Sequence, residues 1–345
     1  MRKLLLNEFV LGLELKIIED DLLLIGMPDP TQQKKKEDKA DKYIPMRSSD
    51  GKYFIPGSSL KGVLRSRAEY IANIIHQGNG VCHIFDQRKK SEAHLPGRLC
   101  CGDRFEIRLK DAEKNQKTLP YATFYADACP ACQLFGHSSF QGRLSVTDFP
   151  ALDSDSGKPF SQTHIAVDRL TAGAAQSKLF TPKYLRDAVF KGSIHIQNFS
   201  IWQLGWLGFV LQDLREGLIR LGRKQTSGYG KLAIQKETVR FRYLGKPPTE
   251  EKLWGIGKYL NDEWIKQYGY GNGLAYESID LPGAQWSTPD HLWYEYSAEA
   301  PPEPLPLWEN ARSAAYHYLQ SFKFTPDMQL KSLQELWDRQ REAAR

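Results

Sequence analysis

The sequence predicts an α+β fold in which one antiparallel sheet carries two helices on the same face. Two observations predict its elements: two segments have apolar residues at helical spacing, and several short segments alternate apolar with polar residues. A third is their order, which is strand, helix, strand, strand, helix, strand once intervening insertions are left aside. Elements in this order close into a single antiparallel sheet.

The composition is that of a globular protein. The 345 residues suffice for one large domain with extensions or for two ordinary domains, with 41% hydrophobic and 26% charged residues. No run reaches the roughly eighteen apolar residues of a membrane helix, and the N-terminal segment lacks a signal peptide's cleavage region. We therefore expect a cytoplasmic protein with no membrane partner. The net charge of +6 permits a nucleic-acid partner and equally fits an ordinary enzyme.

The first strand and the first helix are separated by a polar stretch. Apolar and polar residues alternate at 8–18, which predicts a strand. Residues 28–54 are rich in Pro, Lys and Asp, and are expected to form a solvated loop. The helix that follows is expected to begin at Ser58 or Ser59, either of which is a natural N-cap, and to end near Ile75.

The remaining elements complete the predicted sheet. We expect strands at 142–149, 164–171, 188–198 and 231–243, and a second helix with a strong apolar face at about 204–221. The resulting order is that of a ferredoxin-like (RRM-like) fold, whose exposed sheet face is frequently an RNA platform.

The domain boundary is placed where the composition changes. The ferredoxin-like domain is expected to span 1–243, with insertions at about 25–54, 78–140 and 155–186. Residues 244–345 are rich in Pro and Gly motifs and hold six of the eight tryptophans, so we interpret them as a C-terminal extension. The extension packs either on a neighbouring surface or on its own chain as a small helical subdomain.

The cysteines predict a metal site. They are confined to a single stretch of the chain and are Cys82, Cys100, Cys101, Cys129 and Cys132. An odd number without a secretory signal favours metal over disulfides. Cys129 and Cys132 have the spacing that directs two thiolates at one ion, and Cys82 with Cys100 or Cys101 can complete a tetrahedron. Alternative ligands are His83, His94 and His137. Four thiolates leave no position for water, which predicts structural Zn²⁺ within the 78–140 insertion; five reduced cysteines in a loop are the alternative.

Two segments combine glycine, hydroxyl and basic residues in a way that suits phosphate. Lys61 and Arg65 share one helix face beside a helix N-terminus, whose amides and dipole attract anions. The loop Gly222–Gly230 places Arg223 and Lys224 among glycines, although it lacks the ending of a nucleotide-binding P-loop. The alternative for Lys61 and Arg65 is that they are only solvated charges, and the alternative for the loop is that it is only a long turn.

Five strings, taken together and in order, carry a resemblance. They are IPGSSLKGVLRS from Ile55, CxxCxLFG from Cys129, GRLSVTD from Gly142, VDRLTAGA from Val167 and GYG from Gly228. This combination resembles the backbone subunits of type III CRISPR effector complexes, which are members of the RAMP (repeat-associated mysterious protein) superfamily. The resemblance covers about residues 1–243 and leaves out the tail.

The resemblance implies that the chain binds guide CRISPR RNA, meets target RNA and assembles with other CRISPR effector subunits. The segment Asp168–Ala174 is similar to the thumb hairpin that wedges between guide and target, with Leu179 and Phe180 as its stiff base. The RNA-binding residues expected from the resemblance and the basic segments are Ser58, Ser59, Lys61, Arg65, Arg67, Arg169, Thr171, Arg223, Lys224, Gly228, Tyr229 and Gly230.

The resemblance also implies a cleavage site. Cleaving members carry an aspartate fourteen residues before the Ile of the IPGSS motif, and counting back from Ile55 reaches Asp41. The surrounding KKKEDKA departs from the glycine-rich sequence usual there, so Asp38 is a rival. Such a carboxylate would act as a base or as a ligand of Mg²⁺ or a similar ion, beside an RNA linkage distorted by the thumb.

Three other functions remain open. The first is a non-cleaving structural subunit of the same complex, which Asp41→Ala in an assembled complex would distinguish from an endoribonuclease. The second is a stand-alone endoribonuclease that processes the guide precursor, for which His76 near the end of the first helix is a candidate. The third is a zinc-stabilised adaptor that binds no RNA.

Overall fold

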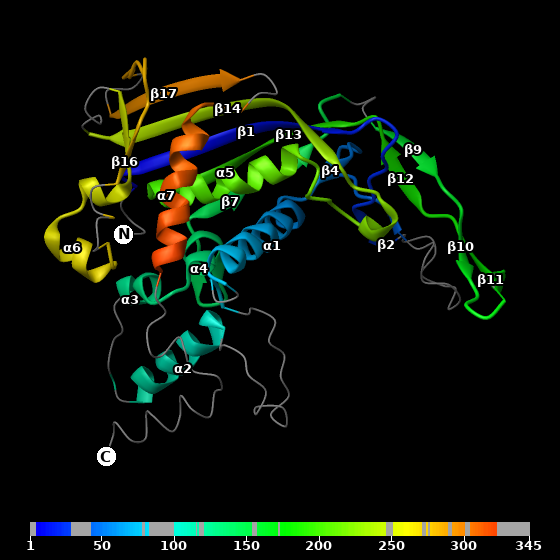
Figure 1. The fold of residues 1–345 in the computed structure, drawn as a ribbon, viewed down its shortest axis with the longest axis horizontal. Coiled ribbons are helices and arrows are strands. Elements are labelled where there is room, and N and C mark those ends of the chain that lie inside the picture. Colours follow the sequence, from blue (N-terminus) through cyan, green and yellow to red (C-terminus); the bar gives the residue numbers. More distant parts are fainter. Residues whose placement is uncertain are drawn as a thin grey trace.

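The chain forms a twisted antiparallel sheet with helices packed on one face (Figure 1). This computed structural model describes residues 5–28, 43–77, 80–82, 100–114, 116, 121–153, 157–171, 173–245, 251–270, 274, 277–288, 292–300 and 304–322. The five strands of the sheet lie in the order β17 (Trp293–Ala300), β14 (Leu232–Leu244), β1 (Asn7–Ile17), β13 (Val189–Gln197) and β7 (Leu144–Val146). Every neighbouring pair is antiparallel, which confirms the predicted mixed fold with an antiparallel sheet.

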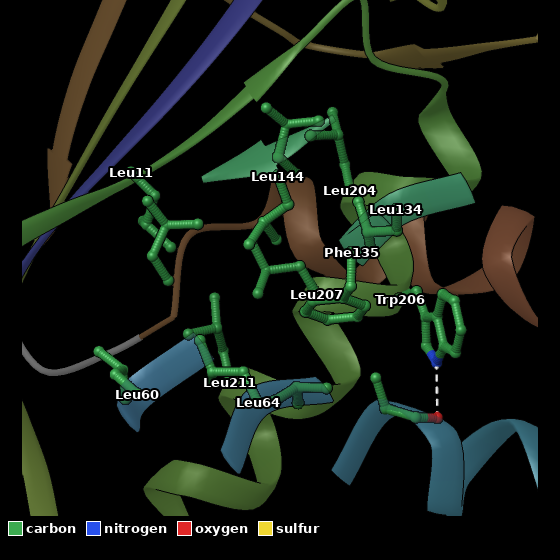
Figure 2. Packing of buried hydrophobic residues seen from close by; sticks show 14 of the residues in the cluster. Leu11, Leu60, Leu64, Leu134, Phe135, Leu144, Leu204, Trp206, Leu207 and Leu211 are labelled. Carbon is green, nitrogen blue, oxygen red and sulfur yellow. Dashed lines mark hydrogen bonds between the residues drawn. The ribbon is translucent and has the colours of Figure 1, made fainter. Parts of the chain in front are cut away.

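The central strand shows why the chain folds this way. In β1 every second side chain, from Phe9 to Ile17, is buried against the helices, as the alternating pattern predicts. The helices supply the other half of the core, and leucines of the sheet and of three helices converge there (Figure 2). Trp206 fills the space between two helices and donates its indole N–H to the carbonyl oxygen of Ala68 at 3.1 Å. A buried indole with a satisfied N–H fixes how these helices lie.

The ends of both principal helices differ from the sequence expectation, and the second helix begins at Ile201, three residues before the expected Leu204. Helix α1 (Gly57–Ile75) has Pro56 as its N-cap, so neither Ser58 nor Ser59 caps it. Proline loses nothing at this position because it has no N–H, and the Gly57 N–H donates to the Asp148 carboxylate at 2.8 Å. Helix α5 (Ile201–Arg215) ends six residues before the expected Leu221. Gly217, with φ +70°, turns the chain out of the helix there.

The insertions contribute smaller elements around the sheet. They are β2 (Gly26–Pro28), β3 (Tyr43–Pro45), β4 (Phe54–Ile55), α2 (Cys101–Lys114), α3 (Tyr121–Ala126), α4 (Pro130–Phe135), β5 (Gly136–His137), β6 (Phe140–Gln141), β8 (Phe149–Pro150), β9 (Lys158–Ser161), β10 (His164–Val167), β11 (Ala174–Phe180) and β12 (Lys183–Arg186). The segment expected as a strand at 164–171 is strand only to Val167, because a turn follows. None of the helices within the described ranges has the length and apolar content needed to cross a membrane.

The described part of the C-terminal region packs on its own chain. It contains β15 (Lys252–Trp254), α6 (Asp262–Gln267), β16 (Ser278–Asp280), β17 and α7 (Leu307–Ser321). Strand β17 extends the sheet beyond β14, and α7 crosses α5 so closely that Gly205 lies against the backbone of Ala311 (Figure 1). Trp308 is buried there, and its indole N–H donates to the buried Glu237 carboxylate.

A carboxylate from the C-terminal region caps α5. Glu277, immediately before β16, accepts the backbone N–H groups of Ile201 (2.6 Å) and Trp202 (3.3 Å). An acidic group at a helix N-terminus satisfies free amides and meets the positive end of the dipole. Burial nevertheless raises the pKa of Glu277 from 4.5 to about 7, and the two N–H donors and the charge of Arg143 offset this rise only in part.

The protein is therefore expected to become more stable as the pH falls from 8 to 5.5. At a pH between 4.5 and about 7, the Glu277 carboxyl is ionised in the unfolded chain and protonated in the folded chain. The stability gained from this protonation is therefore lost as the pH rises through about 7. The full difference is on the order of 3 kcal/mol. Urea unfolding at a series of pH values measures it, and Glu277→Gln should flatten the slope, whereas the exposed Glu263→Gln should leave it unchanged. Equal slopes for all three proteins would contradict this expectation.

Candidate metal centre and nucleic-acid interface

Four buried cysteines come together below the sheet. Cys82 follows α1, Cys101 begins α2, and Cys129 and Cys132 belong to the start of α4. Their sulfur atoms all lie within 4.8 Å of one another, with Cys82 Sγ 3.5 Å from Cys129 Sγ and 3.6 Å from Cys132 Sγ. Four sulfurs around Zn²⁺, each at about 2.3 Å, would be separated by roughly 3.8 Å. The cysteines are thus positioned where they can bind a metal ion.

The local sequence explains how two of the sulfurs converge. Cys129 is the N-cap of α4 and Pro130 occupies its first turn, so the chain turns at once and brings Cys132 back beside Cys129. The Cys129 N–H donates to the sulfur of Cys101 at 3.3 Å. Between the two residues that the sequence left open, Cys101 joins the group, and the buried Cys100 lies outside it.

His137, the histidine alternative that the structure describes, is not in the group. His137 stacks on Phe105, with ring centroids 5.2 Å apart, and His83 and His94 fall outside the described residues. The cysteines also belong to the main hydrophobic core, so this part of the insertion is continuous with the rest of the protein.

The thiols of the cluster hold their protons unequally. Burial acts to raise the pKa of Cys129, but its hydrogen bonds with Cys101, Cys132 and Cys82 outweigh burial and hold the pKa well below its ordinary value. The pKa values of Cys82 and Cys132 are well above the ordinary value, since their protons are shared with neighbouring sulfurs. Four adjacent sulfurs cannot all ionise alone, and a divalent ion removes this obstacle.

The start of α1 is less open than its sequence indicates. The Gly57 N–H is taken by Asp148, and the N–H groups of Ser59 and Leu60 donate to the Pro56 carbonyl. Ser58 is exposed, and Ser59 is partly buried. An anion at this end would therefore rely more on side chains than on the backbone.

The basic residues of α1 have different surroundings. Lys61 is partly buried and forms no ion pair with the residues that the structure describes; burial, followed by the charge of Arg65, lowers its pKa. Arg65 bonds to Glu69, Gly136 and Cys132, and Arg67 pairs with Asp213 of α5 at 2.6 Å. Of the three cations, Lys61 is thus the one without an acidic partner in the described chain.

The loop from Gly222 to Gly230 is held by Asp21. Its carboxylate accepts the N–H groups of Gly230 (3.1 Å) and Lys231 (3.0 Å). Gly228 and Gly230 both have positive φ, and a side chain at Gly230 would meet the Leu221 carbonyl at 2.1 Å. Glycine is therefore required by the turn itself. Arg223 is exposed, and Lys224 adopts a left-handed conformation.

The glycine-rich loop and the predicted thumb meet at an aromatic cluster. The segment predicted as a thumb forms a long hairpin in which β9 pairs with β12 and β10 with β11, and it projects away from the sheet (Figure 1). Tyr229 of the loop packs on Tyr184 and His164 at the base of this hairpin, with centroids 5.2 and 6.0 Å apart. The Tyr229 ring therefore helps to hold the glycine-rich loop against the base of the hairpin.

The tip of the hairpin is apolar and exposed. Asp168 shapes the turn by accepting the N–H groups of Leu170 and Thr171. Leu170 is 97% exposed, and Ile165 and Val167 are more than half exposed. Arg169 and Thr171 are also exposed at the turn. Leu179 and Phe180 pair with Ile165 and His164 in the β10–β11 ladder. An apolar tip on a protruding hairpin is typical of a surface that meets a partner.

The outer face of the sheet carries ion pairs. Arg242 pairs with Glu295 at 2.8 Å, Lys191 with Glu14 at 3.0 Å and Lys236 with Glu299 at 2.9 Å. Carboxylates on this face repel phosphate and engage the cations beside them. The cations of these three pairs are therefore compensated within the sheet itself.

Several contributors were not visible in the sequence. Asp21, Asp148 and Glu277 each hold a backbone turn or helix start that is distant in the chain. No local pattern marks Asp21 or Glu277, and the GRLSVTD string that ends at Asp148 does not reveal its contact with Gly57. Both predicted catalytic candidates, Asp41 and Asp38, lie outside the described residues.

The fold and the cysteine group define a mixed α/β protein with an antiparallel sheet, an inserted cysteine site and a protruding hairpin. A family model described as the RAMP superfamily matches residues 21–233, which is more than half of the chain, and the protein therefore belongs to the RAMP superfamily. This superfamily is associated with CRISPR-related RNA-binding proteins, which act in multi-subunit complexes. No curated protein matches the chain.

Proposed function

We propose that this protein is a guide-RNA-binding backbone subunit of a type III CRISPR effector ribonucleoprotein. The family match supports RNA binding, and the five ordered strings support the type III backbone role. A ferredoxin-like core is supported by the strand order β14–β1–β13–β7, with α1 and α5 in the connections. Structural Zn²⁺ is supported by four buried thiols with spacings close to those of a tetrahedral site.

The observation that carries the proposal is the environment of Lys61. A partly buried ammonium without an acidic partner in the described chain is costly, and a phosphate would compensate its charge. Gly62 follows it on the exposed side of α1, and a side chain there would meet nothing within 4 Å. A nucleic-acid backbone can therefore approach this turn of the helix closely.

The hairpin and the glycine-rich loop extend the proposed interface. Leu170 at the tip would insert between base steps, as apolar wedges do in other nucleic-acid complexes. Arg223 and Lys224 would contact the phosphates beside the hairpin base. A backbone subunit of this kind would contact the backbone of the guide RNA, and base pairing between guide and target would supply the sequence specificity.

We further propose that the protein cleaves target RNA at Asp41, with Asp38 as the alternative residue. Its support is the spacing from Ile55, which falls within the family match. Mg²⁺ or a similar ion would then assist the chemistry. The alternative of a stand-alone precursor-processing enzyme is less favoured, because His76 Nε2 lies 2.8 Å from the carbonyl oxygen of Phe322 and is engaged within its own chain.

Lys61→Gln is expected to weaken binding of single-stranded guide RNA and to reduce the salt dependence of that binding. Loss of one phosphate contact lowers the slope of log K against log salt by about 0.7. Fluorescence anisotropy at several salt concentrations measures both quantities.

The matched control is Lys110→Gln, which removes the same charge from an exposed position on α2 and should leave the slope unchanged. Gly62→Ala supplies a second arm: it should stabilise the helix by up to about 1 kcal/mol and yet weaken RNA binding. RNA affinity and slope equal to wild type in both Lys61→Gln and Gly62→Ala would contradict the proposal.

A further inference from the structure

Arg65 of α1 contacts the cysteine cluster, the end of α4 and a carboxylate of its own helix. Its Nη2 donates to Cys132 Sγ at 3.5 Å, and its Nη1 donates to the Gly136 carbonyl at 2.6 Å. Its Nε donates to the Glu69 carboxylate at 2.7 Å, one helical turn further along α1. The guanidinium also lies 6.0 Å from the centre of the Phe135 ring. Each of the three guanidinium nitrogens of Arg65 therefore has an acceptor within the chain.

These contacts join both ends of α4 to one side chain. Cys132 lies in the first turn of α4, and Gly136 is its C-cap with φ +89°. A side chain at Gly136 would meet the backbone of Gly142 at 2.5 Å, so the chain reversal after α4 is tightly packed. Arg65 thus fixes the position of the cysteine and of the turn that follows it.

The positive charge of Arg65 would compensate the negative charge of a metal-bound cysteine cluster. Four thiolates around a divalent ion carry two net negative charges, and burial of such charge requires compensation. A guanidinium stays protonated in proteins, so Arg65 brings a fixed positive charge to within 3.5 Å of Cys132 Sγ. Hydrogen bonds to a ligating sulfur are a means by which surrounding residues orient ligands and tune a metal.

We propose that Arg65 is an outer-sphere positioning residue of the metal centre, which donates a charged hydrogen bond to the ligating sulfur of Cys132 and couples α1 to the cluster. This inference rests on the proposed metal site. It also separates the roles of two basic residues on one helix face: Lys61 meets the RNA, and Arg65 meets the metal.

The test compares Arg65→Gln, Arg65→Lys and the control Arg67→Gln, each loaded with Zn²⁺. The control also removes a charge from α1 and an ion pair to a neighbouring helix. Competition with a chromophoric chelator should show zinc affinity weakened about 10- to 100-fold in Arg65→Gln, with an intermediate loss in Arg65→Lys. Arg67→Gln should bind zinc as the wild type does.

Two further readouts distinguish this role from general destabilisation and from RNA contact. In Co²⁺-substituted protein, Arg65→Gln should shift the thiolate-to-cobalt charge-transfer band, and Arg67→Gln should not. In zinc-saturated protein, the salt slope of RNA binding should stay at the wild-type value in Arg65→Gln. Wild-type zinc affinity and an unshifted band in both Arg65 variants would overturn the inference while leaving the metal site intact. A wild-type protein that binds no zinc would overturn both, and RNA binding by that protein would leave the proposed function standing.

Discussion

Cys132→Ser is expected to abolish stoichiometric metal binding and to destabilise the whole core. The sulfur of Cys132 belongs to the four-cysteine group and accepts a hydrogen bond from Arg65, so its loss removes one of the four candidate ligands and one of the three acceptors of the guanidinium. The cost is on the order of 4 kcal/mol. For a chain of this size this corresponds to a fall in Tm of roughly 8 °C.

Metal analysis by mass spectrometry and calorimetric unfolding measure the two effects. Cys100→Ser is the matched control, because Cys100 is also buried but lies outside the group. It should keep one metal ion per chain. The expectation fails if Cys132→Ser retains the metal, or if the two serine variants lose it equally.

Gly205→Ala is expected to be the most damaging small substitution in the helical layer. A Cβ atom at this position would lie 1.7 Å from the carbonyl oxygen of Ala311 and 2.3 Å from its carbon, and both are backbone atoms of α7. Neither can move without displacing α7 from α5, so we expect a loss of about 3 kcal/mol or more. Urea denaturation followed by tryptophan fluorescence measures it, because Trp308 is buried at this crossing.

Gly62→Ala makes the same chemical change at an exposed position of α1 and serves as the control. Its new methyl group would meet nothing within 4 Å, so the helix propensity of alanine acts alone. Opposite signs for the two variants would confirm that close helix contact is decisive. A Gly205→Ala protein as stable as wild type would show that α7 can shift at little cost.

Sequence patterns predicted what depends on local spacing. The alternation in β1 and the helical spacing in α1 follow directly from which faces are buried, and the structure confirms both. The metal-binding group was predicted from the number and spacing of the cysteines, although the choice of Cys101 over Cys100 needed the start of α2.

What the sequence could not predict depends on contacts between distant segments. The end of α5 was extended too far, because apolar residues after Gly217 continue the pattern although the backbone has left the helix. The role of Arg65 depends on α4 being folded against α1, since Cys132 and Gly136 are about seventy residues away. Local periodicity contains no information about such a contact.

The pairing of β17 with β14 bears on how the protein can be shortened and how it avoids self-association. Residues 232–244 form a long strand, and on one side residues 237–244 pair with residues 293–300. A chain cut after residue 243 would present that row of unpaired amides and carbonyls as a template for a strand of another molecule, and would uncover the apolar surface beneath α7. We therefore expect β17 and α7, which lie outside the family match, to protect β14 from pairing with other molecules, and the smallest stable unit to extend at least through α7.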